Sequence, residues 1–360
     1  MNVRCLSQLL HWNVAFLVIA LLLPLVDPLL PEAARLGDLM RPIFVFAILA
    51  LGLNVVTGFT GLLNLGVAAF MAIGAYSYAI LTCEIYPYQV GFWWGILITM
   101  AVGAAAGFLL GSPTLRLRGD YLAIVTLGFG EIIQDVLKNL DVITKGTQGI
   151  NPLPYPSIGN YVFETTEYRP WYFLYLGLVV AVVILIRNLE NSRLGRAWIS
   201  VREDELAATC MGINPTKTKL FAFAVGAALA ALAGALFASM LGSTGEPSNY
   251  DFAISIMALC MVIVGGMGNI SGVLLGALVI GGLDSILLTK LSIYLSREGI
   301  GGGMVFTTPT NYKFMLFGLA LVLMMRFRPE GLLPSRRVKL EMHEGDEETA
   351  RGPLKPEKVD

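Results

Sequence analysis

Long stretches without a single formal charge dominate this sequence, and they restrict the chain to a small set of folds. A helix that crosses the hydrocarbon core of a bilayer takes about 20 apolar residues, and several of the stretches reach or approach that length. Charged residues make up only 14% of the 360 residues, whereas ordinary soluble domains carry about 25%. The sequence therefore predicts a polytopic membrane protein. The stretches are residues 13–23, 43–56, 91–110, 171–186, 220–241 and 314–325.

Most catalytic and nucleic-acid-binding classes are excluded by what the sequence lacks. The net charge of −1 gives no reason to expect nucleic acid as a partner. His11 and His343 lie near opposite ends, so a histidine-based metal or catalytic cluster is not expected. The sequence has no Gly-Lys dipeptide and hence no P-loop for ATP. The four cysteines are far apart without a CxxC pair, which argues against zinc and disulfides. They are Cys5, Cys83, Cys210 and Cys260.

We expect an all-α fold of about ten transmembrane helices, within a range of eight to ten. The start of the chain resembles a signal peptide, with Arg4 before an apolar stretch. Asp27 and Pro28 follow instead of a small-x-small cleavage site, which predicts a retained first helix. The expected spans are residues 12–30, 42–57, 66–83, 91–111, 121–140, 171–187, 218–241, 251–266, 270–288 and 311–326.

The basic residues predict the orientation of these spans. With the N-terminus inside, the inward segments hold 17 of the 25 Lys and Arg residues and the outward segments hold 8. Cytoplasmic loops carry an excess of Lys and Arg, so both termini are expected in the cytoplasm. Residues 1–333 would form one transmembrane domain. Residues 334–360 carry dense charge of both signs and few apolar residues, which predicts a disordered cytoplasmic tail.

Two stretches rich in Gly and Asn interrupt the expected spans, at residues 58–66 and 264–272. The span before the first has 16 residues, about 24 Å of helix, which is shorter than a core of about 30 Å. Paired Gly-interrupted segments in the two halves of a transporter point to the transport route. Tight re-entry turns without solute contact are the alternative. The arrangement around 42–83 resembles that around 251–288 and hints at an internal repeat.

Ionisable groups within the membrane are costly and mark functional positions. Glu131 is the carboxylate that we select on this ground, as a structural or pathway residue. A secondary carrier acting without ATPase subunits is the alternative function, and it would use Glu131 or Asp284; the sequence shows no carboxylate–basic relay along one helix. The candidate pathway residues are Asn54, Asn64, Gly66, Glu131 and Asn269.

The longest inward loop, residues 187–219, carries six basic residues between two apolar spans. Residues 194–211 are rich in strong helix formers, and Gly212 followed by Pro215 supplies a stop. A short helix on the cytoplasmic surface is therefore expected, placed to contact a partner. On the outer side, the loop 141–170 would dock a soluble partner or simply connect two spans.

Several motifs resemble one known family. Glu205, Ala207, Ala208 and Gly212 match the cytoplasmic E-x-A-A-x-x-x-G loop of ABC importer permeases. Around this loop the chain resembles the branched-chain amino-acid permease family of the LivM type over nearly its whole length before the tail. One departure is Lys145, where the family more often has Gly. This difference bears on which solute or solute-binding protein the chain would use, and not on the expected fold. The other matching stretches are residues 52–66, 115–121, 126–133 and 328–332.

The resemblance implies the ABC importer permease fold and a multi-pass subunit of the bacterial cytoplasmic (inner) membrane. It implies a second, homologous permease subunit, two ABC ATPase subunits that hydrolyse the ATP, and a periplasmic or extracellular solute-binding protein. Leucine-type amino acids are the first expected solute, followed by urea, short amides and other hydrophobic or aromatic acids. No cofactor is expected on this chain. The residues expected to couple it to the ATPase are Arg196, Asp204, Glu205, Ala208 and Gly212.

Overall fold

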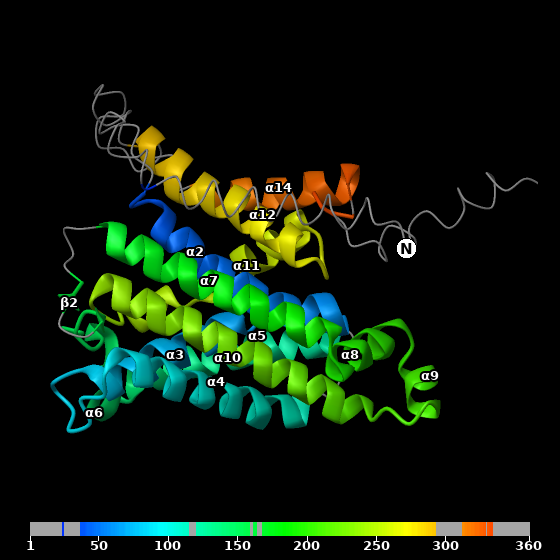
Figure 1. The fold of residues 1–360 in the computed structure, drawn as a ribbon, viewed down its shortest axis with the longest axis horizontal. Helices are drawn as coiled ribbons and strands as arrows, with labels where there is room; N and C mark the ends of the chain where they lie inside the picture. The colour runs from blue at the N-terminus through cyan, green and yellow to red at the C-terminus, as the bar shows by residue number, and fades with distance from the viewer. Residues whose placement is uncertain are drawn as a thin grey trace, which may run out of the picture.

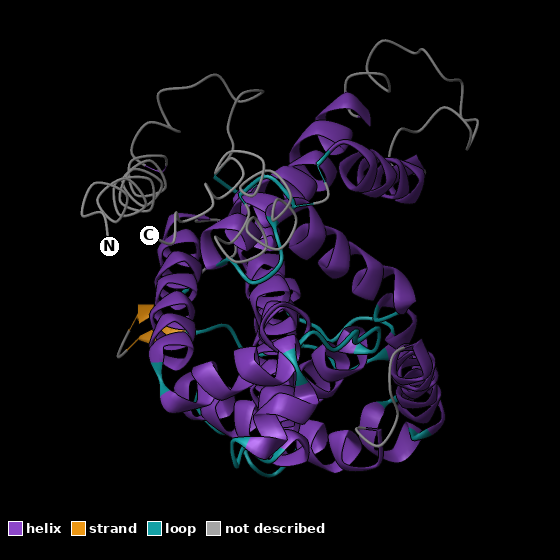
Figure 2. Cartoon of the chain, turned by 90° about the vertical axis from the view of Figure 1, so that its right-hand side faces the viewer, coloured by secondary structure: helices purple, strands orange, loops and turns teal. Residues whose placement is uncertain are grey.

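The computed structural model describes residues 24, 37–114, 120–158, 161–163, 168–292, 312–328 and 330–333. The expected first span at 12–30, apart from Pro24, and the tail at 334–360 lie outside these residues. Within them the chain is helical except for loops and one antiparallel ribbon of β1 (Ser157–Ile158) and β2 (Tyr161–Val162). Figure 2 shows this ribbon at one side of the helices. The expectation of an all-α polytopic fold is confirmed.

Each of the other nine expected spans coincides with a helix. Their apolar residues supply the buried faces, and Gly or Asn stands at several of their ends. The helices are α2 (Met40–Asn54), α3 (Val67–Thr82), α4 (Phe92–Thr114), α5 (Asp120–Asn139), α7 (Tyr168–Asn191), α10 (Pro215–Leu241), α11 (Phe252–Gly265), α12 (Ile270–Gly282) and α14 (Lys313–Phe327). The shorter elements on the opposite side from the loop at residues 187–219 are α6 (Asp141–Thr144), η4 (Gly146–Gln148) and η5 (Pro247–Asn249).

Six helical runs among the described residues are long and apolar enough to cross a membrane. They are Met40–Phe59, Phe92–Thr114, Tyr168–Asn191, Pro215–Leu241, Pro247–Gly265 and Ile270–Ser292. The run Val67–Thr82 is also apolar but shorter. Its 16 residues amount to about 24 Å of helix, which is shorter than a hydrocarbon core of about 30 Å.

The expectation that the first of these runs is too short to cross is wrong. α2 continues into a π-helix, η3 (Val55–Phe59), and the helical run reaches 20 residues. Every residue of η3 is buried, so the wider turn keeps this apolar segment inside the protein. The non-helical stretch therefore begins at Gly61, whose φ is +71°, and not at Gly58. A second π-helix, η6 (Leu283–Leu288), prolongs α12 in the same way.

The second interruption is also shorter than expected. α11 continues to Gly265 and α12 begins at Ile270, so only residues 266–269 are non-helical. Gly266 and Gly268 have φ of +113° and +78° there, conformations that residues with a side chain rarely adopt.

Helix α10 lies at the centre and packs closely against α2, α3 and α4. Its small residues allow this approach: a Cβ added at Gly234 would lie 1.9 Å from the carbonyl oxygen of Met71 on α3. From α3, a Cβ at Gly74 would lie 2.2 Å from the Ala231 oxygen. The small residues along α10 therefore serve packing within this chain.

The helices run across the protein in alternating directions (Figure 1). α7 ends and α10 begins at the end that carries α8 (Arg193–Glu203) and α9 (Glu205–Cys210). The loop with α6 and the strand β2 lie at the opposite end. We call these the α8–α9 end and the α6 end.

Close packing at α10 predicts different outcomes for two Gly-to-Ala substitutions. Gly234→Ala should destabilise the purified protein by about 1–3 kcal/mol, because the added methyl group overpacks the α3–α10 contact. Gly177→Ala is the matched control on α7, where a Cβ would meet nothing within 4 Å. Thermal unfolding in detergent measures both. A G234A protein as stable as G177A would contradict the packing described here.

Candidate functional site

The loop at residues 187–219 forms two helices, so the single helix expected over residues 194–211 is wrong. α8 ends at Glu203 and α9 begins at Glu205, with Asp204 in extended conformation between them. The Asp204 carboxylate accepts hydrogen bonds from the backbone N–H groups of Leu206 (2.8 Å) and Ala207 (3.0 Å). Because Asp prefers this N-cap position, it starts a new helix instead of continuing the old one.

The expected stop at Gly212 is confirmed. Gly212 has φ of +85°, the left-handed conformation typical of the residue after a helix. Asn214 then caps α10 through a hydrogen bond from the Lys217 N–H (3.1 Å), and Pro215 is its first residue. A Cβ at Gly212 would have free space, so the backbone conformation is what requires glycine.

The expected coupling residues lie on and around these two helices. Glu205 forms an ion pair with Lys219 of α10 (2.8 Å), and Ala208 is buried on the inner face of α9. Arg196 donates from its guanidinium to the Asn191 carbonyl oxygen (2.9 Å) on the surface. In this chain the Glu205 carboxylate is thus already paired with a basic group of its own subunit.

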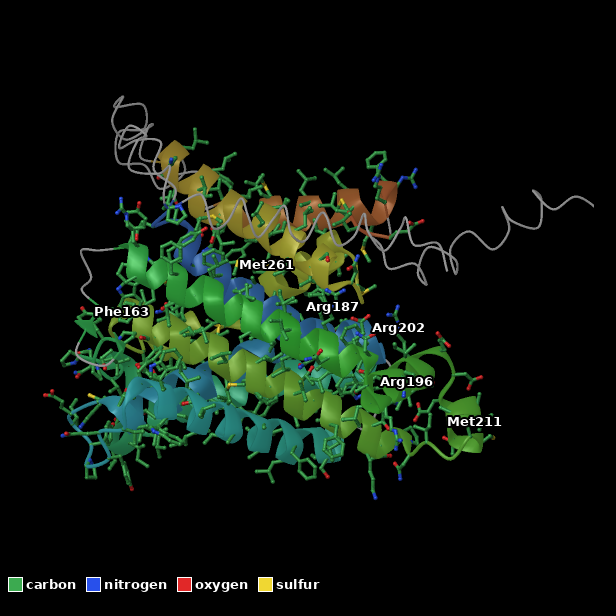
Figure 3. The ribbon with its side chains drawn as sticks, viewed as in Figure 1. Phe163, Arg187, Arg196, Arg202, Met211 and Met261 are labelled. Atoms are coloured by element: carbon green, nitrogen blue, oxygen red, sulfur yellow. The ribbon has the colours of Figure 1, made fainter. Side chains whose placement is uncertain are left out.

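The tip of the loop is apolar although the loop as a whole is polar. Leu206 is 75% exposed and Met211 is 83% exposed, at the two ends of α9. Figure 3 places Met211 at the far extremity of the α8–α9 end. Large exposed apolar side chains at such a position are typical of a surface that another protein covers.

The inner face of α8 is anchored by a tryptophan that the sequence analysis did not select. Trp198 is fully buried and donates from its indole nitrogen to the Thr218 carbonyl oxygen (2.9 Å) at the start of α10. Its ring stacks on Phe59 of η3, with centroids 6.4 Å apart and an interplanar angle of 5°. The sequence feature that could have identified Trp198 is its occurrence as a single tryptophan within a polar loop.

Arg202 is the second residue that sequence reasoning missed. It lies one helical turn beyond Trp198, on the same face of α8. Its guanidinium donates a hydrogen bond to the carbonyl oxygen of Gly58 in η3. Figure 3 shows Arg202 where α8 meets the end of the α2–η3 segment.

The two interrupted segments, far apart in sequence, meet at this place. The side-chain oxygen of Asn54 accepts a hydrogen bond from the Gly268 N–H (2.9 Å). Asn269 caps α12 through the Ser271 N–H (3.1 Å) and donates to the Leu333 carbonyl oxygen (2.9 Å). The Asn54 side-chain nitrogen is buried without a hydrogen-bond partner among the described residues. The structure therefore brings Asn54 and Asn269 into one junction.

The other candidate pathway residues lie against or on α5. The Asn64 side chain accepts from the Gly66 N–H (2.9 Å), and a Cβ at Gly66 would lie 2.3 Å from the Thr126 oxygen. The Leu65 N–H also donates to the Thr126 hydroxyl (3.1 Å). Glu131 lies farther along α5 and is exposed, beside the exposed Ile132. The structure does not bring Glu131 together with the asparagines.

Among the described residues, no group of three or more His, Cys, Asp or Glu side chains could hold a metal ion.

The geometry is that of a membrane protein with an anchored surface loop, and comparison with known proteins gives its family. The family model described as "Branched-chain amino acid transport system / permease component" matches residues 36–325. The chain belongs to the branched-chain amino-acid permease family. No solved structure matches it.

Relatives of this permease include proteins named LivM and LivH. It is 39% identical over 351 residues to the LivM permease of Escherichia coli K12, covering 92% of this chain and 77% of that protein. It is 30% identical over 256 residues to a probable LivM of Methanocaldococcus jannaschii, covering 68% and 70%. The LivH permease of E. coli K12 is 24% identical over 303 residues, covering 80% and 91%. This permease is accordingly a multi-pass membrane subunit of an ABC importer.

The Asp204 cap predicts how α9 responds to substitution. Asp204→Ala should cost about 1 kcal/mol of helix stability, which corresponds to roughly fivefold faster amide hydrogen exchange in α9. Asp204→Asn is the matched control, because Asn caps helices equally well. Hydrogen-exchange mass spectrometry of a peptide covering residues 205–211 measures the difference. Equal exchange in D204A and D204N would show that the carboxylate does not hold the start of α9.

Proposed function

We propose that this permease imports branched-chain amino acids, with leucine-type solutes first, as part of an ATP-driven complex. The E. coli relatives LivM and LivH are both named as permease proteins of a high-affinity branched-chain amino-acid transport system. Their joint naming supports a pairing of this chain with a second, homologous permease. Two ATPase subunits would hydrolyse ATP on one side, and a periplasmic or extracellular solute-binding protein would deliver the amino acid on the other.

The observation that carries the proposal is the exposed apolar tip of an anchored loop. Leu206 and Met211 are exposed at the extremity of the α8–α9 end, whereas Trp198 behind them is fully buried in the transmembrane body. A surface for a partner is thus attached directly to the spans that would have to move. The α8–α9 end would face the cytoplasm, together with both termini. Arg196, Asp204, Glu205, Ala208 and Gly212 would shape the ATPase contact, and this chain would bind no cofactor.

The exposed side of α5 is the surface that we assign to the transport route. It carries Glu131 between apolar side chains such as Ile124 and Ile132, which are 65% and 60% exposed. In the complex this side would face the second permease. A carboxylate there complements the ammonium group of an amino acid. Asn64 and Gly66 lie behind α5 and would hold it in place, as Asn54 and Asn269 would hold the junction of the broken segments.

Reconstitution tests the proposed function. The permease is placed in proteoliposomes with its homologous permease partner, the ATPase subunits and the solute-binding protein, and uptake of radiolabelled leucine is measured with and without ATP. Uptake that requires both ATP and the ATPase subunits is expected. Leucine flux of the same size through the permease pair alone would instead favour a secondary carrier.

The apolar tip predicts a loss of ATPase affinity when its leucine is replaced. Leu206→Ser removes a side chain whose burial in the interface would contribute about 1.5–3 kcal/mol, so the affinity of the ATPase subunits should fall at least about tenfold. Ile85→Ser is the matched control, because Ile85 is 51% exposed at the α6 end. Titration of ATPase subunits onto nanodisc-embedded permease measures both. An unchanged affinity in L206S would place the ATPase contact elsewhere.

A further inference from the structure

The side chain of Arg202 lies among three glycines that belong to both interrupted segments. Its guanidinium donates to the Gly58 carbonyl oxygen. A Cβ added at Gly61 would lie 3.1 Å from the Arg202 Cγ, and one added at Gly268 would lie 3.3 Å from its Nη1. One side chain of α8 therefore binds the end of α2–η3 and lies beside the start of the first non-helical stretch and the middle of the second.

The two segments are locked to each other at the same point. A Cβ at Gly58 would lie 2.1 Å from the Asn54 side-chain oxygen and 2.7 Å from the Gly268 nitrogen, the two atoms that form the hydrogen bond between the segments. Any side chain at Gly58 would therefore separate them. The carbonyl group that accepts from Arg202 belongs to the residue whose lack of a side chain permits this bond.

A third piece of chain joins from the C-terminal side. The N–H groups of Leu332 and Leu333 donate to the carbonyl oxygens of Val264 (2.8 Å) and Gly265 (3.0 Å), at the end of α11. A Cβ at Gly331 would lie 2.4 Å from the Gly266 Cα. We call the assembly of residues 54–61, 264–269 and 330–333 the inner junction. A displacement of residues 264–269 would thus also displace α2, α12 and the segment after α14.

Two side chains of α8, Trp198 and Arg202, connect it to the inner junction, and their interactions differ in kind. The stacking of Trp198 on Phe59 is apolar and has no strong directional requirement. The Arg202 hydrogen bond is directional and charge-assisted, and within the described part of the chain its acceptor is a backbone carbonyl group, not a carboxylate. Such a bond holds a definite geometry, so a displacement of α8 is passed to the residue whose carbonyl group accepts it.

We propose that Arg202 is a positioning residue that transmits the movement of α8 to both interrupted segments at once. This inference rests on the proposed function, in which ATPase subunits displace the α8–α9 loop. Through Gly58 the guanidinium moves the end of α2–η3. The Asn54–Gly268 hydrogen bond, beside which the guanidinium lies, passes this movement to the link between α11 and α12. Without Arg202, α8 would remain attached through Trp198, but its displacement would reach the inner junction only loosely.

The test measures coupling, not activity alone. Complete complexes are reconstituted with wild-type permease, R202M, R202K and the control R193M, in which an exposed arginine of the same helix is replaced. Leucine uptake and ATP hydrolysis are measured in the same vesicles, and their ratio is compared. The proposal predicts a ratio about tenfold lower in R202M, as expected for loss of one charge-assisted hydrogen bond, with complex assembly and ATP hydrolysis within about twofold of wild type.

R202K should lower the ratio about threefold, because the compact ammonium group of Lys does not reproduce the planar guanidinium geometry at the Gly58 carbonyl group. R193M should keep the wild-type ratio. A wild-type ratio in an assembled R202M complex would overturn the proposal. If the R202M complex fails to assemble, the R202K complex is the test instead. A wild-type ratio of uptake to ATP hydrolysis in R202K would then overturn the proposal. Absence of ATP-dependent uptake in the wild-type complex would count against the proposed function, and is thereby distinguished from a failure of the Arg202 inference.

Discussion

Unpaired backbone groups cannot be left in a bilayer, where no water satisfies them and each costs several kcal/mol. The two interruptions of this permease are arranged around that constraint. The Gly268 N–H is satisfied by the Asn54 side chain and the Leu65 N–H by the Thr126 hydroxyl. The carbonyl groups at the end of α11 are satisfied by the segment after α14. Neither interruption can exist in isolation, because each depends on partners from elsewhere in the chain.

The central position of α10 follows from the same environment. Between helices in lipid there is no hydrophobic driving force, so close van der Waals contact has to hold them together. Gly226 of α10 faces Gly52 of α2, and a Cβ at Gly226 would lie 2.9 Å from the Gly52 oxygen. Similar contacts hold α3 and α4 to it. Because α10 follows directly after the α8–α9 loop, the most tightly packed helix is also the one next to the proposed ATPase contact.

The spans were predictable because absence of charge over about 20 residues reports burial in a membrane directly. Hydropathy does not show which other segments of the chain a segment packs against or hydrogen-bonds with. The predictions that depended on such contacts are the ones that failed. The π-helix at 55–59 continues a helix that Gly58 was expected to end, and its burial by other segments is not visible in the local sequence. Asp204 divides the loop because a cap competes with helix continuation. Asn54 and Asn269 were selected as polar residues lining the transport route. In the structure their hydrogen bonds hold the backbone of the inner junction.

The two halves of the α8–α9 loop are attached with very different strength, and this difference determines what each can do. α9 is held by a buried alanine and by the partly exposed Glu205–Lys219 pair, and such pairs contribute about 0–1 kcal/mol. α8 is held by a fully buried tryptophan, whose removal from a core typically costs about 3–5 kcal/mol. A partner that pushes on the tip would therefore shift α9 relative to the body before it detaches α8. α9 can adapt to the surface that covers it, whereas α8 moves together with whatever Trp198 and Arg202 contact. Force applied at Leu206 and Met211 would then reach the spans both through α8, which is the stiffer element, and through the start of α10, where Lys219 pairs with Glu205.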